Sequence, residues 1–319
     1  MDTTYTVVDP TLVLDRITDA AALEKLLRIM REMSNDDARV PRYPGPNPVS
    51  LDRSQFGQLA SRPYYLCEKT DGVRYALVCC RLASSRDGRI LKVCALVDRA
   101  LTAYLLPLRH VPRAMFQGSL LDGELAWNKA KGRWEYVVFD ALCVSGVPVL
   151  DAPLPDRMDA AHRVLRVYKE AAEDVVTLRA KSFFPCTRFD EFERHLATVP
   201  FAVDGVILTP AADPVKYGRH MGLFKLKHGS QHTVDFLVGQ DGASLAVFDA
   251  GKHVTVGRLR QRAQPGSIVE CTKAADDLWD LVGVRVDKTT ANDLYTFQKT
   301  LVNIREGLTL ADVKRVVGA

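Results

Sequence analysis

The chain has 319 residues, 47% of them hydrophobic and 26% charged, with a formal net charge of +4 at pH 7. These values are ordinary for a globular protein and exclude a disordered or low-complexity chain. The length is typical of about two domains. The mildly basic charge is compatible with anionic partners but does not require them.

The N-terminus and the cysteines favour an intracellular protein. MDTTYTVVDP lacks the basic-then-apolar pattern of a signal peptide. No run of about 18 apolar residues occurs, so we expect a protein that is neither secreted nor bound to a membrane. The seven cysteines are odd in number, form no CxxC pair and lie mostly in apolar runs. We expect reduced core thiols rather than disulfides or zinc ligands.

The first half of the chain is predicted to be a helix followed by strands. Apolar residues at helical spacing predict a helix over residues 9–33. The prolines of VPRYPGPNPVSL, residues 40–51, predict an ordered loop or a linker. Alternating apolar runs then predict strands over Tyr64–Cys67, Arg74–Leu82, Ile90–Val97, Ser119–Trp127 and Trp134–Leu142.

In the second half of the chain the predicted secondary structure changes near Thr233. Before it, helices are predicted over Asp156–Ala172 and Phe189–Ala197, and strands over Val206–Thr209 and Leu223–Lys227. After it, short strands separated by turns predict a small all-β barrel. A last helix begins near Thr309 in LTLADVKRVVGA.

Lys69 lies in LCEKTDGVRYAL, between an apolar strand and an Asp-Gly corner. A lysine at a strand edge is usually a solvated surface charge, and its spacing leaves that interpretation open. The alternative is a nucleophilic amine, which needs neighbouring groups that favour its neutral form.

Other charged residues lie in similar positions. Glu124 in LLDGELAW and Asp204 in VDGVILTP each adjoin a glycine in an apolar run. Lys225 and Lys227 alternate with apolar residues in LFKLKH, so both point to one face of a strand. Each is compatible with a solvated face. Together with Lys69 they suit a cleft that holds a nucleotide, its phosphates and a metal ion.

Six motifs in a fixed order carry a family resemblance. They are KTDGVR (Lys69–Arg74), LDGEL (Leu121–Leu125), YVVFDAL (Tyr136–Leu142), VDGVILTP (Val203–Pro210), LFKLK followed by TVDF (Leu223–Phe236), and RVDK (Arg285–Lys288). In this order they resemble the mRNA capping enzyme guanylyltransferases, which are covalent nucleotidyltransferases like the ATP-dependent DNA and RNA ligases. YPGPNPVSL ahead of Lys69 favours capping over ligation. The compact length is similar to that of the single-function capping enzymes of large DNA viruses.

The resemblance implies an α+β fold with two domains. A nucleotidyltransferase domain with antiparallel sheets and flanking helices is expected over residues 1–235. A C-terminal OB-fold β-barrel is expected over residues 236–304. The helix expected over residues 305–319 is placed to pack back on the first domain.

The resemblance also implies a reaction. Lys69 would attack the α-phosphate of GTP, release pyrophosphate and form a lysyl-GMP phosphoramide, from which GMP passes to the 5'-diphosphate end of RNA. The amine must be neutral to attack. Lys225, Lys227 and a bound Mg²⁺ or Mn²⁺ would favour the neutral form by like-charge repulsion, and would also stabilise charge on the phosphate.

Roles for the remaining residues follow from the matched motifs. Asp204, Lys225 and Lys227 would join Lys69 in catalysis, and Glu124 and Asp204 would contact the metal. The expected nucleotide-binding residues are Thr70, Arg74, Arg99, Glu124, Phe139, Lys181, Ile207, Arg285, Asp287 and Lys288.

Within this nucleotide-binding set the expected contacts differ. Arg74 and Glu124 would hold the ribose, and Arg99 would lie along the path of the nucleotide or the RNA. Phe139 and Ile207 would hold the guanine between their apolar faces. Such a contact would suit any purine. Lys181 would donate to guanine O6, although a surface lysine before an apolar run is the alternative.

The last motif would act at the β and γ phosphates. Arg285, Asp287 and Lys288 belong to the barrel and would reach the phosphates only when that domain closes. Many family members carry an arginine where Gly283 stands, so part of this contact is missing or comes from a neighbour such as Lys273.

Other functions find less support. No GxxxxGK[ST] loop occurs. HGSQH (His228–His232) is a poor zinc site because Gly229 and Ser230 disfavour a helix. CVSGVPV (Cys143–Val149) lacks the histidine and arginine of a cysteine phosphatase loop. We therefore expect a monomer that depends on a separate RNA triphosphatase and cap methyltransferase, in the nucleus or, for a viral protein, in the host nucleus or cytoplasm. An ATP-dependent polynucleotide ligase and an inactive nucleotide-fold scaffold remain as alternatives.

Overall fold

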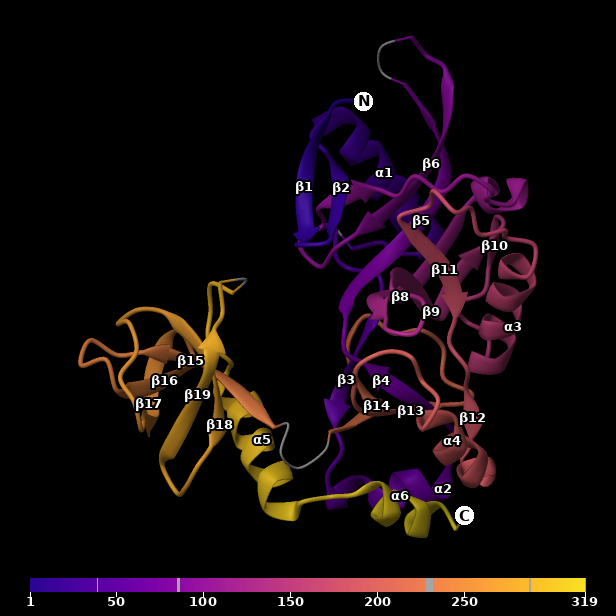
Figure 1. Ribbon diagram of the computed structural model, residues 1–319. Helices are drawn as coiled ribbons and strands as arrows, with labels where there is room; N and C mark the ends of the chain where they lie inside the picture. The colour runs from indigo at the N-terminus through magenta and orange to yellow at the C-terminus, as the bar shows by residue number, and fades with distance from the viewer. Residues whose placement is uncertain (39, 85–86, 228–231, 287, 319) are drawn as a thin grey trace. The chain divides into compact units, whose positions relative to one another are not determined.

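The computed structural model describes residues 1–38, 40–84, 87–227, 232–286 and 288–318. The chain forms two compact units (Figure 1). Unit 1 comprises Met1–Val49, Ser61–Val203 and Ile207–Phe224, and unit 2 comprises Ser50–Ala60, Asp204–Val206 and Lys225–Ala319. None of the helices in the described ranges has the length and apolar character needed to cross a membrane.

Helices and strands alternate irregularly along the chain. The helices are α1 Ala20–Met33, α2 Phe56–Ser61, α3 Leu154–Leu165, α4 Phe189–Leu196, α5 Leu294–Glu306 and α6 Leu310–Val317, with short 3₁₀ turns at Arg53–Gln55, Arg113–Gln117 and Cys186–Arg188. The first strands are β1 Thr3–Asp9, β2 Leu12–Ile17, β3 Pro46–Ser50, β4 Tyr64–Thr70, β5 Val73–Ala83, β6 Ile90–Val97, β7 Ala103–Leu105, β8 Ser119–Asn128, β9 Arg133–Val144 and β10 Val147–Pro148. The later strands are β11 Val176–Ala180, β12 Phe184–Pro185, β13 Val203–Pro210, β14 Gly218–Lys227, β15 Thr233–Val238, β16 Ser244–Asp249, β17 Lys252–Leu259, β18 Ile268–Lys273 and β19 Leu278–Val284.

A nine-stranded sheet forms the centre of unit 1. Its order is β1-β2-β7-β6-β5-β8-β9-β10, and β11 pairs in parallel with β9. Strand β5 explains why both faces are covered: Tyr75 and Leu77 pack in a core with helix α3, whereas Ala76 and Val78 pack in a core with helix α1. Successive side chains of a strand point to opposite faces, so a continuous apolar run such as β5 requires a covering layer on each side.

A second sheet carries the strand of Lys69. Its order is β12-β4-β13-β14-β3. Helix α4 contacts β4 and β12, and its Phe189 and Phe192 are buried. The strand and helix predicted from Leu223 and Phe189 onward are therefore confirmed as β14 and α4.

The C-terminal part of unit 2 is a closed barrel with strand order β15-β16-β17-β19-β18. Phe236 and Trp279 stack edge to face in its core, with ring centroids 4.8 Å apart. Phe297 of α5 joins this core and so anchors the helix to the barrel (Figure 1). The α+β class with antiparallel sheets and a C-terminal barrel, as predicted, is confirmed.

The predicted helix over residues 9–33 is wrong in its first half. Residues 3–17 form the β1–β2 hairpin, and α1 begins only after Asp19, whose side chain accepts a hydrogen bond from Ala22 N. Leu12 and Leu14 are buried, whereas Val13 between them is 47% exposed. That alternation has the period of a strand, and the helical spacing of the leucines was coincidental.

Other boundaries also moved. Residues 46–50 of the predicted proline loop form strand β3, the helix predicted over Asp156–Ala172 is the shorter α3, and α5 lies where only strands were predicted. The strands predicted between Tyr64 and Leu142 are confirmed, most of them with slightly longer bounds. The seven cysteines are all buried and free, as predicted.

Candidate active site

A pocket in unit 1 gathers most of the predicted nucleotide-binding residues. Lys69 reaches it from β4, within the second sheet. The other predicted residues that line it are Arg74, Arg99, Glu124, Phe139, Lys181 and Ile207. They come from segments that are distant in sequence, so this grouping is a property of the fold.

At Gly72 the turn of the KTDG motif packs closely against strand β8, which carries the LDGEL motif. A Cβ on Gly72 would lie 2.5 Å from the carbonyl oxygen of Leu125 and 2.9 Å from Cγ of Glu124. Real Cβ atoms do not approach so closely, so only glycine fits where this turn passes β8. Close packing against β8 is therefore enough to explain the glycine of this motif, whether or not a ligand is bound.

Arg74 and Glu124 are direct partners across the β5–β8 ladder. Directly opposed residues point to the same face of a sheet, so both side chains reach the pocket. Arg74 is held further by the buried carboxylate of Asp122, which accepts from its Nε at 2.9 Å and from its Nη2.

Phe139 enters the pocket because of an irregularity in β9. The β8–β9 register passes from Asp122↔Asp140 to Gly123↔Val138, which leaves Phe139 unpaired as a β-bulge. A bulge redirects a side chain that the regular alternation would place elsewhere. The ring lies 5.3 Å from Cζ of Arg74 and 5.7 Å from Nζ of Lys181, so two cations border its face.

Lys181 is buried, contrary to its alternative interpretation as a surface residue. Its Nζ donates to the Glu68 carbonyl oxygen at 2.9 Å and to Thr70 Oγ1 at 2.9 Å. These two acceptors flank Lys69 in sequence, so Lys181 fixes the strand that carries it. Thr70 is itself fully buried and is not among the residues that line the pocket.

Sequence reasoning missed a buried ion pair in the pocket wall. Arg157 of α3 donates to Asp140 through Nε at 2.6 Å and through Nη2 at 3.0 Å. Its Nη1 donates to the carbonyl oxygens of Ala152 and Asp213, at 2.6 and 2.9 Å. One guanidinium thus joins a strand, a helix and two loops. Asp140 stands in the YVVFDAL motif, but no sequence signal marks Arg157 as its partner.

His220 is a further missed residue of the pocket. It is buried, its Nδ1 accepts from Gly222 N at 3.0 Å, and its Nε2 lies 3.6 Å from Asp213 Oδ2. Burial lowers the pKa of His220, with the charge of Lys216 acting in the same direction. The imidazole is therefore neutral at pH 7 and adds no charge to the pocket.

Unit 2 contains the remaining predicted catalytic residues, Asp204, Lys225 and Lys227. Lys227 Nζ lies 3.0 Å from Asp204 Oδ2. Burial, together with the charges of Lys227 and Lys225, lowers the pKa of His232. Lys225 and Lys227 thus lie close enough to His232 to act on its charge. Residues 228–231 of HGSQH, the segment judged a poor zinc site, lie outside the described residues.

In the barrel, Asp235 gathers the basic residues of the last motif. Its carboxylate accepts from Arg285 Nη1 at 2.9 Å and from Lys288 Nζ. Asp287 lies outside the described residues. Gly283 has open space where a side chain would start, and Lys273 donates to the Asp276 carbonyl oxygen.

The carboxylates expected to contact a metal are Glu124 and Asp204. Within the described ranges, no group of three or more His, Cys, Asp or Glu side chains is arranged to hold an ion. Mg²⁺ commonly takes one or two carboxylates and completes its shell with water and substrate phosphates. Either carboxylate is of the type that such an ion binds, and the described residues form no cage for a permanently bound one.

Two family models match the chain. The chain matches the mRNA capping enzyme catalytic domain over residues 14–229 and the mRNA capping enzyme C-terminal domain over residues 219–313. The first match covers more than half of the chain and contains the whole pocket of unit 1.

Similar proteins include fungal capping enzyme subunits. The mRNA-capping enzyme subunit alpha of Yarrowia lipolytica is 27% identical over 308 residues, covering 82% of this chain and 78% of the relative. The subunit alpha of Saccharomyces cerevisiae is 25% identical, covering 92% and 83%. Among solved structures, mycobacterial DNA ligase D complexed with ATP and MES has a TM-score of 0.42 at 15% identity, covering 76% of this chain and 96% of that one. That structural likeness is too weak to carry an argument.

Arg157→Met should destabilise the protein by about 3–5 kcal/mol, because it leaves the buried Asp140 carboxylate without its partner. The double variant Arg157→Met with Asp140→Asn should lose less than the sum of the two single variants. Urea denaturation measures each free energy of unfolding. Arg188→Met, which breaks an exposed pair with Glu191, is the control and should leave the free energy of unfolding nearly unchanged, because solvent screens such a pair. If Arg157→Met and Arg188→Met lose the same small amount of stability, Arg157 does not support the pocket wall.

Proposed function

The chain belongs to the mRNA capping enzyme family and is an mRNA guanylyltransferase, and on that premise we propose that Lys69 carries the transferred GMP. The observation that supports this role is the unit 1 pocket, in which Lys69 shares a wall with an aromatic ring, cations and a carboxylate. The family implies GTP as substrate and the 5' end of RNA as the site of action.

The proposed reaction has two steps. The neutral Lys69 amine attacks the α-phosphorus of GTP, a P–N bond forms, the P–O bond to pyrophosphate breaks, and the amine releases a proton. An oxygen of the RNA 5'-diphosphate then attacks the same phosphorus, the P–N bond breaks and the lysine recovers its electron pair. Both steps depend on positioning and charge neutralisation more than on strong covalent catalysis.

The base pocket is proposed to use Phe139, Ile207 and Lys181. Phe139 and Ile207 line the same pocket and offer flat apolar contact to a purine. A lysine ammonium has three N–H donors, and the protein accepts from Lys181 at two sites. The third donor suits guanine O6, whereas the amino group of adenine at that position would meet a positive charge.

Contacts to the ribose and to the phosphates are proposed for residues of both units. Arg74 and Glu124 hold the ribose, and Arg99, an exposed residue that lines the pocket, follows the nucleotide or RNA. Asp204, Lys225 and Lys227 act at the α-phosphate. Arg285, Asp287 and Lys288 contact the β and γ phosphates when the barrel closes, and residues 1–235 and 236–304 are the domains that move.

A divalent cation completes the proposed site. Glu124 and Asp204 are the side chains that would contact Mg²⁺ or Mn²⁺, whose bound form neutralises charge on the phosphates. We further propose that the protein acts as a monomer in a nucleus, or in a host cell if it is of the compact viral type. RNA triphosphatase and cap methyltransferase activities then come from separate proteins.

Purified protein with α-labelled GTP and a divalent cation should acquire an acid-labile, alkali-stable label, as expected of a P–N bond. Lys69→Ala and Lys69→Arg should not be labelled, because arginine stays protonated and cannot attack. Parallel incubation with α-labelled ATP distinguishes the ligase alternative, which predicts the opposite preference. Full labelling of Lys69→Ala would refute the assignment.

Lys181→Met should reduce GTP labelling by more than tenfold while ATP labelling stays poor, since a hydrogen bond from a charged group contributes about 1.5–3 kcal/mol. The measurement is kcat/KM of labelling for both nucleotides, at a temperature where circular dichroism shows the variant to be folded. Lys129→Met, at an exposed position, is the control. An unchanged GTP-to-ATP ratio would mean that guanine is recognised elsewhere.

Arg285→Ala and Lys288→Ala should slow formation of lysyl-GMP by about ten- to a hundredfold, because each loses a charged contact to the leaving pyrophosphate. Transfer from isolated lysyl-GMP protein to RNA involves no pyrophosphate and should change less. Single-turnover kinetics of each step separate the two, with Arg260→Ala, from an exposed barrel pair, as control. Equal losses in both steps would assign the barrel to RNA binding or to folding.

A further inference from the structure

The proline-rich segment ahead of Lys69 has no role in the reaction described above, yet it contacts the pocket. We infer that Tyr43 and Asp122 are positioning residues that fix the guanidinium of Arg74 for the nucleotide. This inference rests on the proposed function, because it takes Arg74 to hold the ribose of GTP.

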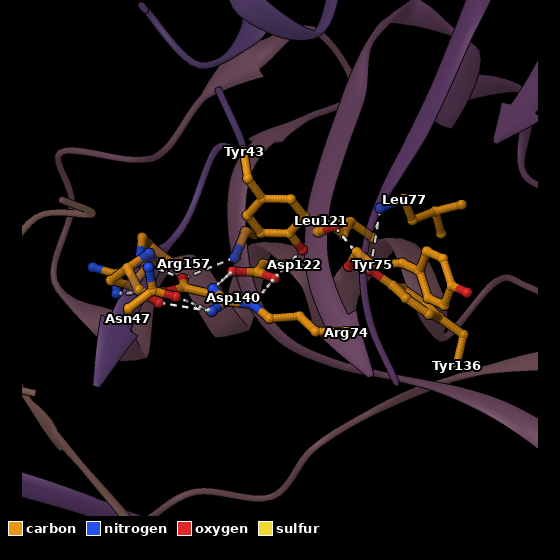
Figure 2. A network of polar contacts seen from close by, with 12 residues as sticks. Tyr43, Asn47, Arg74, Tyr75, Leu77, Leu121, Asp122, Tyr136, Asp140 and Arg157 are labelled. Atoms are coloured by element: carbon orange, nitrogen blue, oxygen red, sulfur yellow. Dashed lines mark hydrogen bonds and ion pairs between the residues drawn. The ribbon is translucent and has the colours of Figure 1, made fainter. Parts of the chain in front are cut away.

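A continuous set of polar contacts joins these three side chains (Figure 2). Tyr43 Oη donates to Asp122 Oδ1 at 2.9 Å, and the same oxygen accepts from Arg74 Nε at 2.9 Å. Asp122 Oδ2 accepts from Arg74 Nη2, and the Pro46 carbonyl oxygen accepts from Arg74 Nη1 at 2.8 Å. The protein thus holds N–H groups on all three nitrogens of a rigid, planar donor, which fixes the direction of the remaining ones.

The rings around Arg74 restrict it further. Its Cζ lies 5.1 Å from the Tyr43 ring centroid and 5.3 Å from the Phe139 ring centroid. Tyr43 therefore restrains Arg74 in two ways. Its hydroxyl holds the Asp122 carboxylate, and its ring lies against the guanidinium of Arg74. Since Phe139 and Arg74 both line the pocket and Tyr43 does not, Tyr43 acts only through Arg74.

Strand register places Asp122 next to Arg74 and behind the pocket. Asp122 opposes Ala76 across the β5–β8 ladder, one step along the same face from the Arg74↔Glu124 pair. Its side chain is 1% exposed and does not line the pocket. A carboxylate in this position orients Arg74 from behind, while Glu124 lines the pocket.

The close approach of the proline segment depends on Gly45. A Cβ there would lie 2.5 Å from Arg74 Nη2 and would also collide with the Asp122 carboxylate. The glycine lets the backbone lie against the ion pair, and Pro46 next to it supplies the carbonyl acceptor. This accounts physically for a glycine between two prolines in YPGPNPVSL.

The charges support an ion pair with a neutral phenol. Burial raises the pKa of Asp122, and Arg74 opposes that shift. Burial likewise disfavours the charge on Arg74, but Asp122 outweighs it and raises the pKa of Arg74. The geometry decides for the charged pair, since three donors converge on the carboxylate. Burial also raises the pKa of Tyr43, so its hydroxyl remains a donor at neutral pH.

The test is a double-mutant cycle on guanylylation. Tyr43→Phe, which keeps the ring and removes the hydroxyl, should lower kcat/KM for labelling by GTP about tenfold. In the Arg74→Lys background, which preserves the charge that buried Asp122 needs, the same change should cost less than about twofold. Asp122→Asn should show the same dependence on Arg74.

Two further readouts separate positioning from general support of the fold. The preference for GTP over 2'-deoxy-GTP or 3'-deoxy-GTP should shrink in Tyr43→Phe, because Arg74 no longer points at the ribose. Tyr136→Phe is the matched control. Its buried hydroxyl accepts from Leu77 N at 3.1 Å and lies 2.8 and 3.0 Å from the Tyr75 and Leu121 carbonyl oxygens, which share its single O–H (Figure 2). It should lose stability but keep the preference.

The outcomes distinguish this inference from the function it rests on. If the wild type is labelled and Tyr43→Phe costs the same in both backgrounds, Tyr43 does not act through Arg74 and the inference is overturned alone. If the wild type is not labelled but binds GTP in a calorimetric titration, the cycle is repeated on Kd with the same expected pattern. If it neither binds nor is labelled by GTP, the proposed function and the inference fail together.

Discussion

Charge buried in the walls of the unit 1 pocket is the constraint on which the rest of that unit depends. Removing an isolated ion from water costs more than a domain's whole net stability, so each buried charge needs a partner at short range. The pairs are Asp122 with Arg74, Asp140 with Arg157, and Glu68 with Lys181. Each joins segments that are far apart in sequence. The same contacts that make the charges tolerable therefore fix the shape of the pocket.

Such pairs are weak evidence for stability, because desolvation offsets much of their attraction. Their use here is geometric. Phosphoryl transfer depends on groups held in place before the substrate arrives, and a bidentate guanidinium cannot rotate without losing both bonds. Lys181 illustrates the point, since its acceptors Glu68 and Thr70 flank Lys69. The position of Lys181 and the course of the strand that carries Lys69 therefore depend on the same contacts.

In unit 2, too, acidic side chains hold basic side chains in place. Arg285 and Lys288 would repel each other if left alone, and the shared carboxylate of Asp235 brings them together. Asp235 is held in turn, because its backbone N–H donates to Asn292 Oδ1. Lys227 is paired with Asp204 in the same way. Basic groups that suit a polyphosphate are thus kept compact within the protein by acidic partners.

The sequence by itself determined the parts of this protein that depend on local chemistry. Alternating apolar runs predicted the strands around Lys69 and the barrel, and the motifs predicted several of the residues that line the pocket, among them Lys69, Arg74, Glu124, Phe139 and Ile207. Local pattern failed at Leu12 and Leu14, where two periods fit the same leucines and only the pairing with β1 decided between them. It could not give the bulge at Phe139, because a bulge exists only relative to a partner strand's register. Nor could it join Arg157 to Asp140 or Tyr43 to Asp122, because a buried charge selects its partner by proximity in space, and only the tertiary structure creates that proximity.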